Sequence, residues 1–223
     1  HLHHGPIDLV IGANGPGRAA ALARAARRFR TVLEELAAEL PLLRRPLGEW
    51  PAGPVARRMA HAVAPFADVF VTPMAAVAGA VAVEIADAMR GPSVTKIHVN
   101  NGGDIAFHLQ GAESVTALSP AGEIRLTAAD TGEVGGIATS GWRGRSHSLG
   151  IADAVTVLAA SAAAADVAAT LVANAVDLPG HPAIQRAPAC ALSPDSDLGE
   201  RPVTTGRGAL SAACAARALG RGA

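Results

Sequence analysis

The sequence predicts an α+β protein in which helices pack on a mostly antiparallel sheet. Two observations favour this class. Two pairs of alternating apolar runs are each joined by a short turn, which is typical of antiparallel hairpins. Other segments carry apolar residues at helical intervals, and they lie before and after these hairpins. At 223 residues the chain is long enough to bury a sizeable core, and we expect a single domain over residues 1–223.

The composition excludes some classes of function. Lys plus Arg and Asp plus Glu number 19 each, so nothing favours a nucleic-acid partner or an anionic membrane surface. Half of the residues are hydrophobic but only 3% are aromatic, so the core must be built from Ala, Val, Leu and Ile. Two cysteines are too few for a disulfide scaffold and fit a reducing compartment. We therefore expect a cytoplasmic protein, and a homo-oligomer because such assemblies are common.

The N-terminal third should begin with a strand that ends in a glycine-rich turn, where Pro16 is placed to open a helix. The histidines His1, His3 and His4 before it are expected to be solvated and disordered. In order, the expected elements are a strand at Pro6–Ala13, one amphipathic helix at Pro16–Leu40 stopped by Pro41, a proline-rich loop at Arg44–Pro54, a helix at Val55–Ala64 and a strand at Asp68–Thr72.

The middle of the chain should contain a helix opened by Pro73 and then two hairpins. Small residues cluster on the first two turns of this helix, where they permit close approach of another backbone or of a flat ligand. The expected strands are Thr95–Asn100 and Asp104–Leu109 around an Asn-Gly-Gly turn, Ser114–Leu118 and Glu123–Ala128, one beginning at Gly135, and Ala154–Ala160.

The apolar stretch from Ala154 to Val176 has the length of a membrane span, but Asp166 in its middle argues against one. A buried strand that turns at Ser161 into a buried helix explains the same residues. From about residue 177 we expect largely irregular coil, followed by an edge strand within Val203–Ser211 and a final helix at Leu210–Leu219.

Two groups of small polar residues indicate a ligand site. Thr139, Ser140 and Gly141 follow a strand-like run, where their hydroxyl and backbone N–H groups can face phosphates or carboxylates. Asp166 and Thr170 are four residues apart on one helix face, and a carboxylate with a hydroxyl one turn away is half of a hard-cation site.

Four segments in this order carry a family resemblance: VTPMAAVAGAVAVEI, VNNGGDIAF, GGIATSGWRGR and VTVLAASAAAADVAAT. Over about residues 5–180 the chain resembles the ApbE-like family, whose best-known members are FAD:protein FMN transferases. It is most similar to the branch that carries the NNGGD and GIATSGWRGRSxSLGIAD sequences. The resemblance implies two intertwined T-fold-like lobes with the active site between them.

The resemblance also implies roles for individual residues. Asn101, Gly102, Gly103 and Asp104 match the family's N-x-G-G-D turn beside the flavin, and Thr139, Ser140 and Gly141 match its T-S-G segment. Asp166 and Thr170 match its A-D-x-x-x-T motif, which binds Mg²⁺ with a backbone carbonyl that would fall near Ala78. The cofactors implied are FAD and Mg²⁺, and the partner implied is an acceptor protein that receives FMN on Thr or Ser.

The sequence departs from the family pattern at two points. Ala78 stands where the transferases have the Lys of an A-K-G sequence, and RGRSHSLGIAD replaces a longer segment with two histidines. Three hypotheses therefore stay open. The first is an FMN transferase that uses FAD and Mg²⁺. The second is an enzyme of different chemistry on the same fold, which binds a small anion through Arg143, Arg145 and His147. The resemblance links this alternative to sulfur and homocysteine metabolism. The third is a non-catalytic flavin-binding or interaction protein.

Overall fold

The computed structural model describes residues 1–223 and confirms the α+β class. The chain forms two compact units, each built from two segments. The first unit contains residues 1–138 and 157–167, and the second contains residues 139–156 and 168–223. The chain therefore passes from the first unit to the second, back to the first and again to the second.

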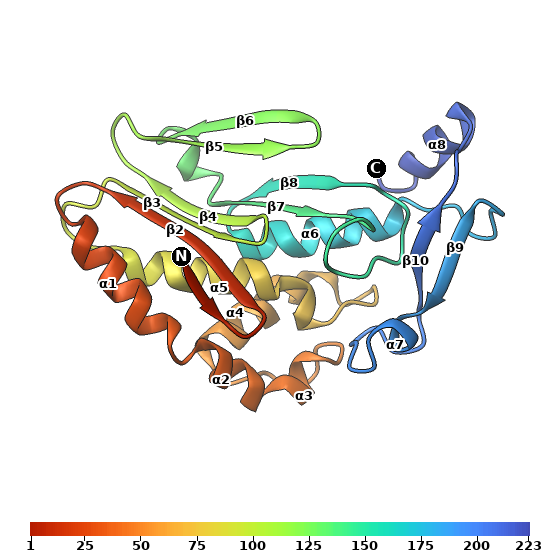
Figure 1. The fold of residues 1–223 in the computed structure, drawn as a ribbon, viewed down its shortest axis with the longest axis horizontal. Coiled ribbons are helices and arrows are strands. Elements are labelled where there is room, and N and C mark those ends of the chain that lie inside the picture. The colour runs from red at the N-terminus through yellow and green to blue at the C-terminus, as the bar shows by residue number, and fades with distance from the viewer. The chain divides into compact units, whose positions relative to one another are not determined.

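Ten strands form one large and two small sheets (Figure 1). The large sheet has six strands in the order β1-β2-β3-β4-β7-β8, and the pairs from β1 to β7 are antiparallel. The small sheets are the antiparallel pairs β5-β6 and β9-β10. The strands are β1 Leu2–His4, β2 Ile7–Asn14, β3 Lys96–Asn101, β4 Asp104–Leu109, β5 Ser114–Ser119, β6 Gly122–Thr127, β7 Gly136–Ser140, β8 Val155–Ala159, β9 Ile184–Pro188 and β10 Pro202–Arg207.

Eight α-helices and three short 3₁₀ helices complete the structure. No helix combines the length and the apolar character that crossing a membrane requires. The α-helices are α1 Arg18–Phe29, α2 Val32–Ala38, α3 Leu40–Leu43, α4 Pro54–Val63, α5 Val77–Met89, α6 Ala162–Ala175, α7 Ala189–Leu192 and α8 Ala212–Leu219, and the 3₁₀ helices are η1 Ala64–Phe66, η2 Pro73–Ala76 and η3 Asp130–Gly132.

In the first unit, α5 packs on one face of the large sheet and is flanked by α1 and α4 (Figure 1). Strand residues at every second position, such as Ile97 and Val99, point to this face and are fully buried. Phe107 pairs with His98 rather than with Val99, so it points to the opposite face. There the β5-β6 hairpin covers it and completes a second apolar cluster. Both faces of the sheet therefore contribute to the core.

In the second unit, residues 177–206 are more regular than the sequence predicts. They contain β9, α7 and β10 in place of irregular coil. Pro188 and Pro202 face each other at one end of the β9-β10 ladder, a position where the missing N–H of proline is tolerated. Strand Ile184–Pro188 shows no apolar alternation, so periodicity could not indicate it. The expected edge strand is β10, and the expected final helix is α8.

The N-terminal region corrects two further predictions. The histidine tract is ordered, because Leu2–His4 pairs with β2 and His3 lies opposite Asp8. The single helix expected at Pro16–Leu40 is interrupted after Phe29, and α2 begins after Thr31, whose hydroxyl donates to Glu35. Pro41 does not stop the helical region, because it occupies the first turn of α3, where proline is tolerated.

The segment Asp68–Thr72 is not a strand. Its apolar residues do not share one buried face, because Val69 is 52% exposed while the neighbours Val71 and Thr72, just before η2, are buried. The other predicted elements are present, including the Asn-Gly-Gly hairpin of β3 and β4 and the Ser161 turn between β8 and α6.

Candidate functional site

The side chain of Asp166, a residue of α6, lies at the N-terminal end of α5. Its carboxylate accepts the backbone N–H of Gly79 at 3.0 Å, and the N–H of Ala78 also donates to it. Both donors belong to the first turn of α5, whose N–H groups have no partners within the helix. A carboxylate is favoured at this position because the helix dipole places partial positive charge there. Asp166, from α6, therefore caps α5.

The Asn-Gly-Gly turn brings two more polar groups to this end of α5. Asn101 and Asp104 face each other at the end of the β3-β4 ladder, and Gly102 and Gly103 between them have φ of 67° and 117°. Positive φ at both central residues is the conformation of a two-residue hairpin turn, and it favours glycine. The Asn101 side chain donates to the backbone oxygen of Ala78 at 3.1 Å. Both Asn101 and Asp104 are buried.

The two carboxylates of this cluster repel each other. Burial and then the neighbouring charge of Asp104 hold the pKa of Asp166 well above its ordinary value, against the opposing hydrogen bonds from Gly79 and Ala78. A like charge nearby disfavours the ionised form, and a bound cation would favour it. A cation at this place would therefore favour the ionised form of Asp166.

Two glycines let α6 begin at this place. A Cβ on Gly79 would lie 2.3 Å from the backbone oxygen of Ala162, and a Cβ on Gly136 would lie 2.1 Å from the backbone nitrogen of Ala162. The first turn of α6 is therefore pressed against both α5 and β7. The sequence indicated this only as small residues at the start of a helix, and the close approach seen here is that of another backbone. These contacts set the position of Asp166.

The start of α6 is also capped by a side chain. Ala164 donates its backbone N–H to the Ser161 hydroxyl at 3.2 Å. We expect Ser161→Ala to lower the free energy of unfolding by about 1 kcal/mol, the usual cost of losing an N-terminal cap. Urea denaturation measures this cost. Ser161→Asn, which keeps a capping oxygen, should lose only a small part of it, and an equal loss in both variants would contradict the capping role.

The oxygen atoms of the cluster suit a hard cation. The carboxylates of Asp166 and Asp104 and the backbone oxygen of Ala78 are of the type that Mg²⁺ prefers. The structure contains no group of three or more His, Cys, Asp or Glu side chains that could hold a metal ion. A cation here would therefore be bound by two carboxylates with backbone oxygen, water or ligand oxygen. We name these residues the α5 cluster: Ala78, Gly79, Asn101, Asp104 and Asp166.

Thr170 and the Thr-Ser-Gly segment belong to the second unit. Thr170 lies one turn after Asp166 in α6, and its hydroxyl is 3.4 Å from that of Ser140. The hydroxyls of Thr139 and Thr156 are 2.9 Å apart. Gly141 is closely packed, because a Cβ there would lie 2.4 Å from the backbone oxygen of Asp153. The structure thus joins Thr170 to Ser140 as neighbours within this unit.

The three residues of the predicted anion-binding loop have different surroundings. Arg143 donates to Asp153 at 2.7 Å, Arg145 is exposed, and His147 is partly buried. Arg207, at the end of β10, donates to the other oxygen of Asp153 at 2.7 Å. The sequence did not indicate Arg207, because 54 residues and two strands separate it from Asp153.

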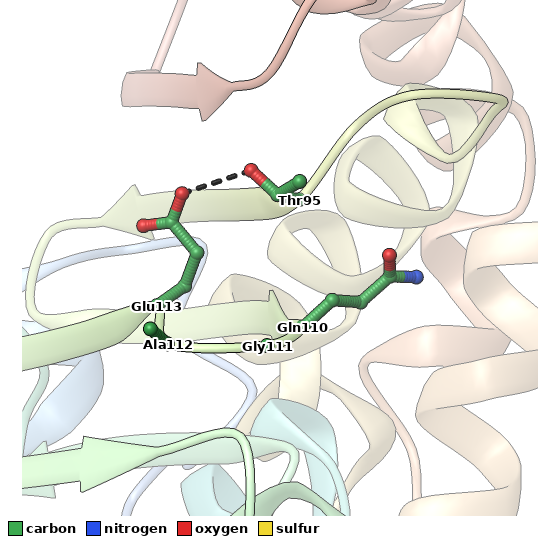
Figure 2. A pocket seen from close by; sticks show the side chains of 5 residues that line it. All are labelled: Thr95, Gln110, Gly111, Ala112 and Glu113. Atoms are coloured by element: carbon green, nitrogen blue, oxygen red, sulfur yellow. Dashed lines mark hydrogen bonds between the residues drawn. The ribbon is translucent and has the colours of Figure 1, made fainter.

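A cavity of about 600 Å³ lies elsewhere in the first unit, and Figure 2 shows it. The Glu113 carboxylate in its wall accepts the Thr95 hydroxyl at 2.8 Å and the Asn14 amide at 2.9 Å. Gln110 points away from Glu113. The remaining lining residues are Gly111 and Ala112, so none of the residues predicted to bind a ligand contributes to it.

Comparison with known proteins identifies relatives. The chain is 38% identical over 156 residues to a UPF0280 protein of Methanothrix thermoacetophila, covering 66% of this chain and 65% of the relative. It is 35% identical over 175 residues to UPF0280 protein MK0206 of Methanopyrus kandleri, covering 75% and 69%. A UPF0280 protein of Methanococcoides burtonii is 37% identical over 120 residues, covering 52% and 50%. The chain thus spans between half and about two thirds of the curated relatives that it matches.

A sequence profile covers more of the chain than any of these alignments. The profile of the family described as "AbpE bacteria" matches residues 1–223. The match includes both units and every motif on which the resemblance rests. The chain therefore belongs to this bacterial ApbE-like family.

Proposed function

We propose that this chain binds FAD together with Mg²⁺ and that the α5 cluster holds the cation. One observation carries the proposal: the carboxylates of Asp166 and Asp104 lie close enough to interact, beside the backbone of Ala78 at the N-terminus of α5. Ionising both carboxylates costs stability unless a cation offsets their repulsion. Family membership supports the flavin nucleotide as the ligand.

Each residue of the α5 cluster has a distinct task in this proposal. Asp166 loses its proton and offers a carboxylate oxygen to the cation, while the N–H groups of Ala78 and Gly79 hold the carboxylate in place. Asn101 orients the Ala78 carbonyl through its amide. Bound Mg²⁺ would supply positive charge to a pyrophosphate. The Asn-Gly-Gly turn exposes backbone without side chains, which permits close approach of a nucleotide.

The reaction we propose for the whole protein is FMN transfer. The oxygen of an acceptor Thr or Ser hydroxyl forms a bond to the phosphorus of the FMN moiety, and the bond from that phosphorus to the bridging oxygen breaks. AMP leaves with the electron pair, and the hydroxyl proton passes to solvent. The reaction is tested by mixing protein, FAD, MgCl₂ and candidate acceptors and measuring AMP release. Binding of FAD without AMP release across a panel of acceptors would reduce the function to flavin binding.

Binding itself is tested by isothermal titration with FAD, with and without MgCl₂. We expect affinity that depends on Mg²⁺ in the wild type and falls at least about tenfold in Asp166→Asn, which is about 1.4 kcal/mol. Asp8→Asn is the matched control, because Asp8 is an exposed carboxylate of the same unit. Equal FAD affinity with Mg²⁺ and with EDTA would contradict the proposal, and so would full affinity in Asp166→Asn.

A further inference from the structure

Asp153 in the second unit gathers three donors. Its Oδ1 accepts Nε of Arg143 at 2.7 Å and the Trp142 indole N–H at 3.1 Å, and its Oδ2 accepts Nη2 of Arg207 at 2.7 Å. Arg143 also lies over the Trp142 ring, 5.0 Å from its centre. Three side chains therefore meet at one carboxylate, and the four residues come from three parts of the chain. We name them the Asp153 cluster: Trp142, Arg143, Asp153 and Arg207.

The Asp153 cluster carries more positive than negative charge. Two guanidinium groups share a single carboxylate, which leaves a formal charge of +1. Burial alone would raise the pKa of Asp153, but hydrogen bonds from Arg143 and Arg207 outweigh it and lower the pKa. The carboxylate thus stays ionised and positions both arginines. The excess positive charge favours binding of an anionic ligand.

Arg207 has an unsatisfied donor. Its Nε is buried and has no hydrogen-bond partner in the chain. A buried donor without an acceptor is unfavourable, so a ligand oxygen that reaches the Arg207 guanidinium would stabilise it. Arg143 is 63% exposed, so the rest of its guanidinium is open to solvent.

The fold holds Arg207 in this position. The hydroxyl of Thr204 donates to the backbone oxygen of Gly150 at 2.7 Å, and its N–H donates to that of Ser148 at 2.9 Å. These bonds attach β10 to the loop that precedes Asp153. Between Thr204 and Gly206 the ladder shifts register, directly before Arg207. Bulges of this kind redirect the following side chains and are frequent beside functional sites.

We infer that Arg143 and Arg207, held by Asp153, bind the phosphate group of a small phosphorylated molecule. A tetrahedral phosphate offers oxygens to two guanidinium groups at once, and arginine forks match this geometry. Its negative charge offsets the excess charge of the Asp153 cluster. Every residue involved belongs to the second unit, and the inference requires neither flavin nor cation.

The test is titration with inorganic phosphate at constant ionic strength and without Mg²⁺, followed by calorimetry. We expect saturable binding in the wild type that weakens at least about tenfold in Arg207→Gln and in Arg143→Gln, as the loss of one charge-assisted hydrogen bond implies. Arg217→Gln is the matched control, because it removes the same charge from an exposed position on α8. Its affinity for phosphate should equal that of the wild type.

Other outcomes would overturn the inference. These are the absence of saturable phosphate binding in the wild type, or the same loss of affinity in Arg217→Gln as in Arg207→Gln. Arg143 is largely exposed, so Arg143→Gln keeps the test valid if Arg207→Gln fails to fold. Asp166→Asn should bind phosphate as the wild type does, which separates this site from the proposed cation site.

Discussion

Replacing Gly79 with Ala should lower the free energy of unfolding by about 1 to 2 kcal/mol. A Cβ at this position meets backbone atoms of Ala162 at 2.3 and 2.5 Å, which cannot move aside as a flexible side chain could. Overpacking of this kind costs roughly 1 to 3 kcal/mol or more, while Ala regains about 1 kcal/mol of helix propensity. The clash outweighs the gain. Urea denaturation followed by circular dichroism measures the difference.

Gly48→Ala is the control for this prediction. No atom lies within 4 Å of the position that its Cβ would occupy, and its φ is not in the left-handed region. We expect it to be neutral or to stabilise by about 0.4 to 1 kcal/mol, because Ala restricts the unfolded chain more than Gly does. If Gly79→Ala were as stable as Gly48→Ala, the close packing of α5 on the start of α6 would be refuted.

Replacing Asp104 with Asn should greatly weaken the stabilisation of the protein by Mg²⁺. In EDTA at neutral pH, we expect the variant to melt above the wild type, because the charge that raises the pKa of Asp166 is gone. At a Mg²⁺ concentration of 100 times Kd, the wild type should gain about 2.7 kcal/mol. The variant should gain much less, because it keeps only one of the two carboxylates. The measurement is the melting temperature of the wild type and of Asp104→Asn, each in EDTA and in MgCl₂.

The pH dependence of this effect follows from the direction of the pKa shift. The folded pKa of Asp166 lies above the unfolded value of about 3.9. Without metal, its contribution to stability is therefore greatest below the unfolded pKa and is lost as pH rises through the folded pKa. The difference in stability between wild type and Asp104→Asn should grow over that window. Mg²⁺ affinity should rise over the same window, because the cation displaces the proton. A difference that stays constant with pH would contradict the carboxylate interaction.

Much of the first unit could be predicted from local sequence. The Asn-Gly-Gly turn requires positive φ at two positions, so the β3-β4 hairpin and the pairing of Asn101 with Asp104 follow from turn chemistry. Asp166 was indicated by its place in an apolar helix and by a family motif. Its contact with the N-terminus of α5 could not be predicted from local pattern, because 87 residues separate Asp166 from Gly79.

Most of the parts that were predicted wrongly share a physical cause. Leu2–His4 and Ile184–Pro188 are short strands without clear alternation, and each is stabilised by a partner strand rather than by its own pattern. Thr31 interrupts a helical periodicity that continues on both sides of it. In the two strands tertiary contacts override a weak local preference, whereas the helix break accompanies a local bond from Thr31 to Glu35. Arg207 was missed for the same reason, since its position beside Asp153 depends on where β10 packs.

Mn²⁺ titration followed by NMR tests most directly whether the α5 cluster binds a divalent cation. Mn²⁺ is paramagnetic and broadens the signals of nuclei close to it. We predict that substoichiometric Mn²⁺ first broadens the backbone amide signals of Ala78 and Gly79 and the side-chain amide of Asn101, and that Mg²⁺ restores them. Broadening that begins at exposed acids such as Asp8, while the Gly79 signal stays sharp, would show that the cation binds elsewhere.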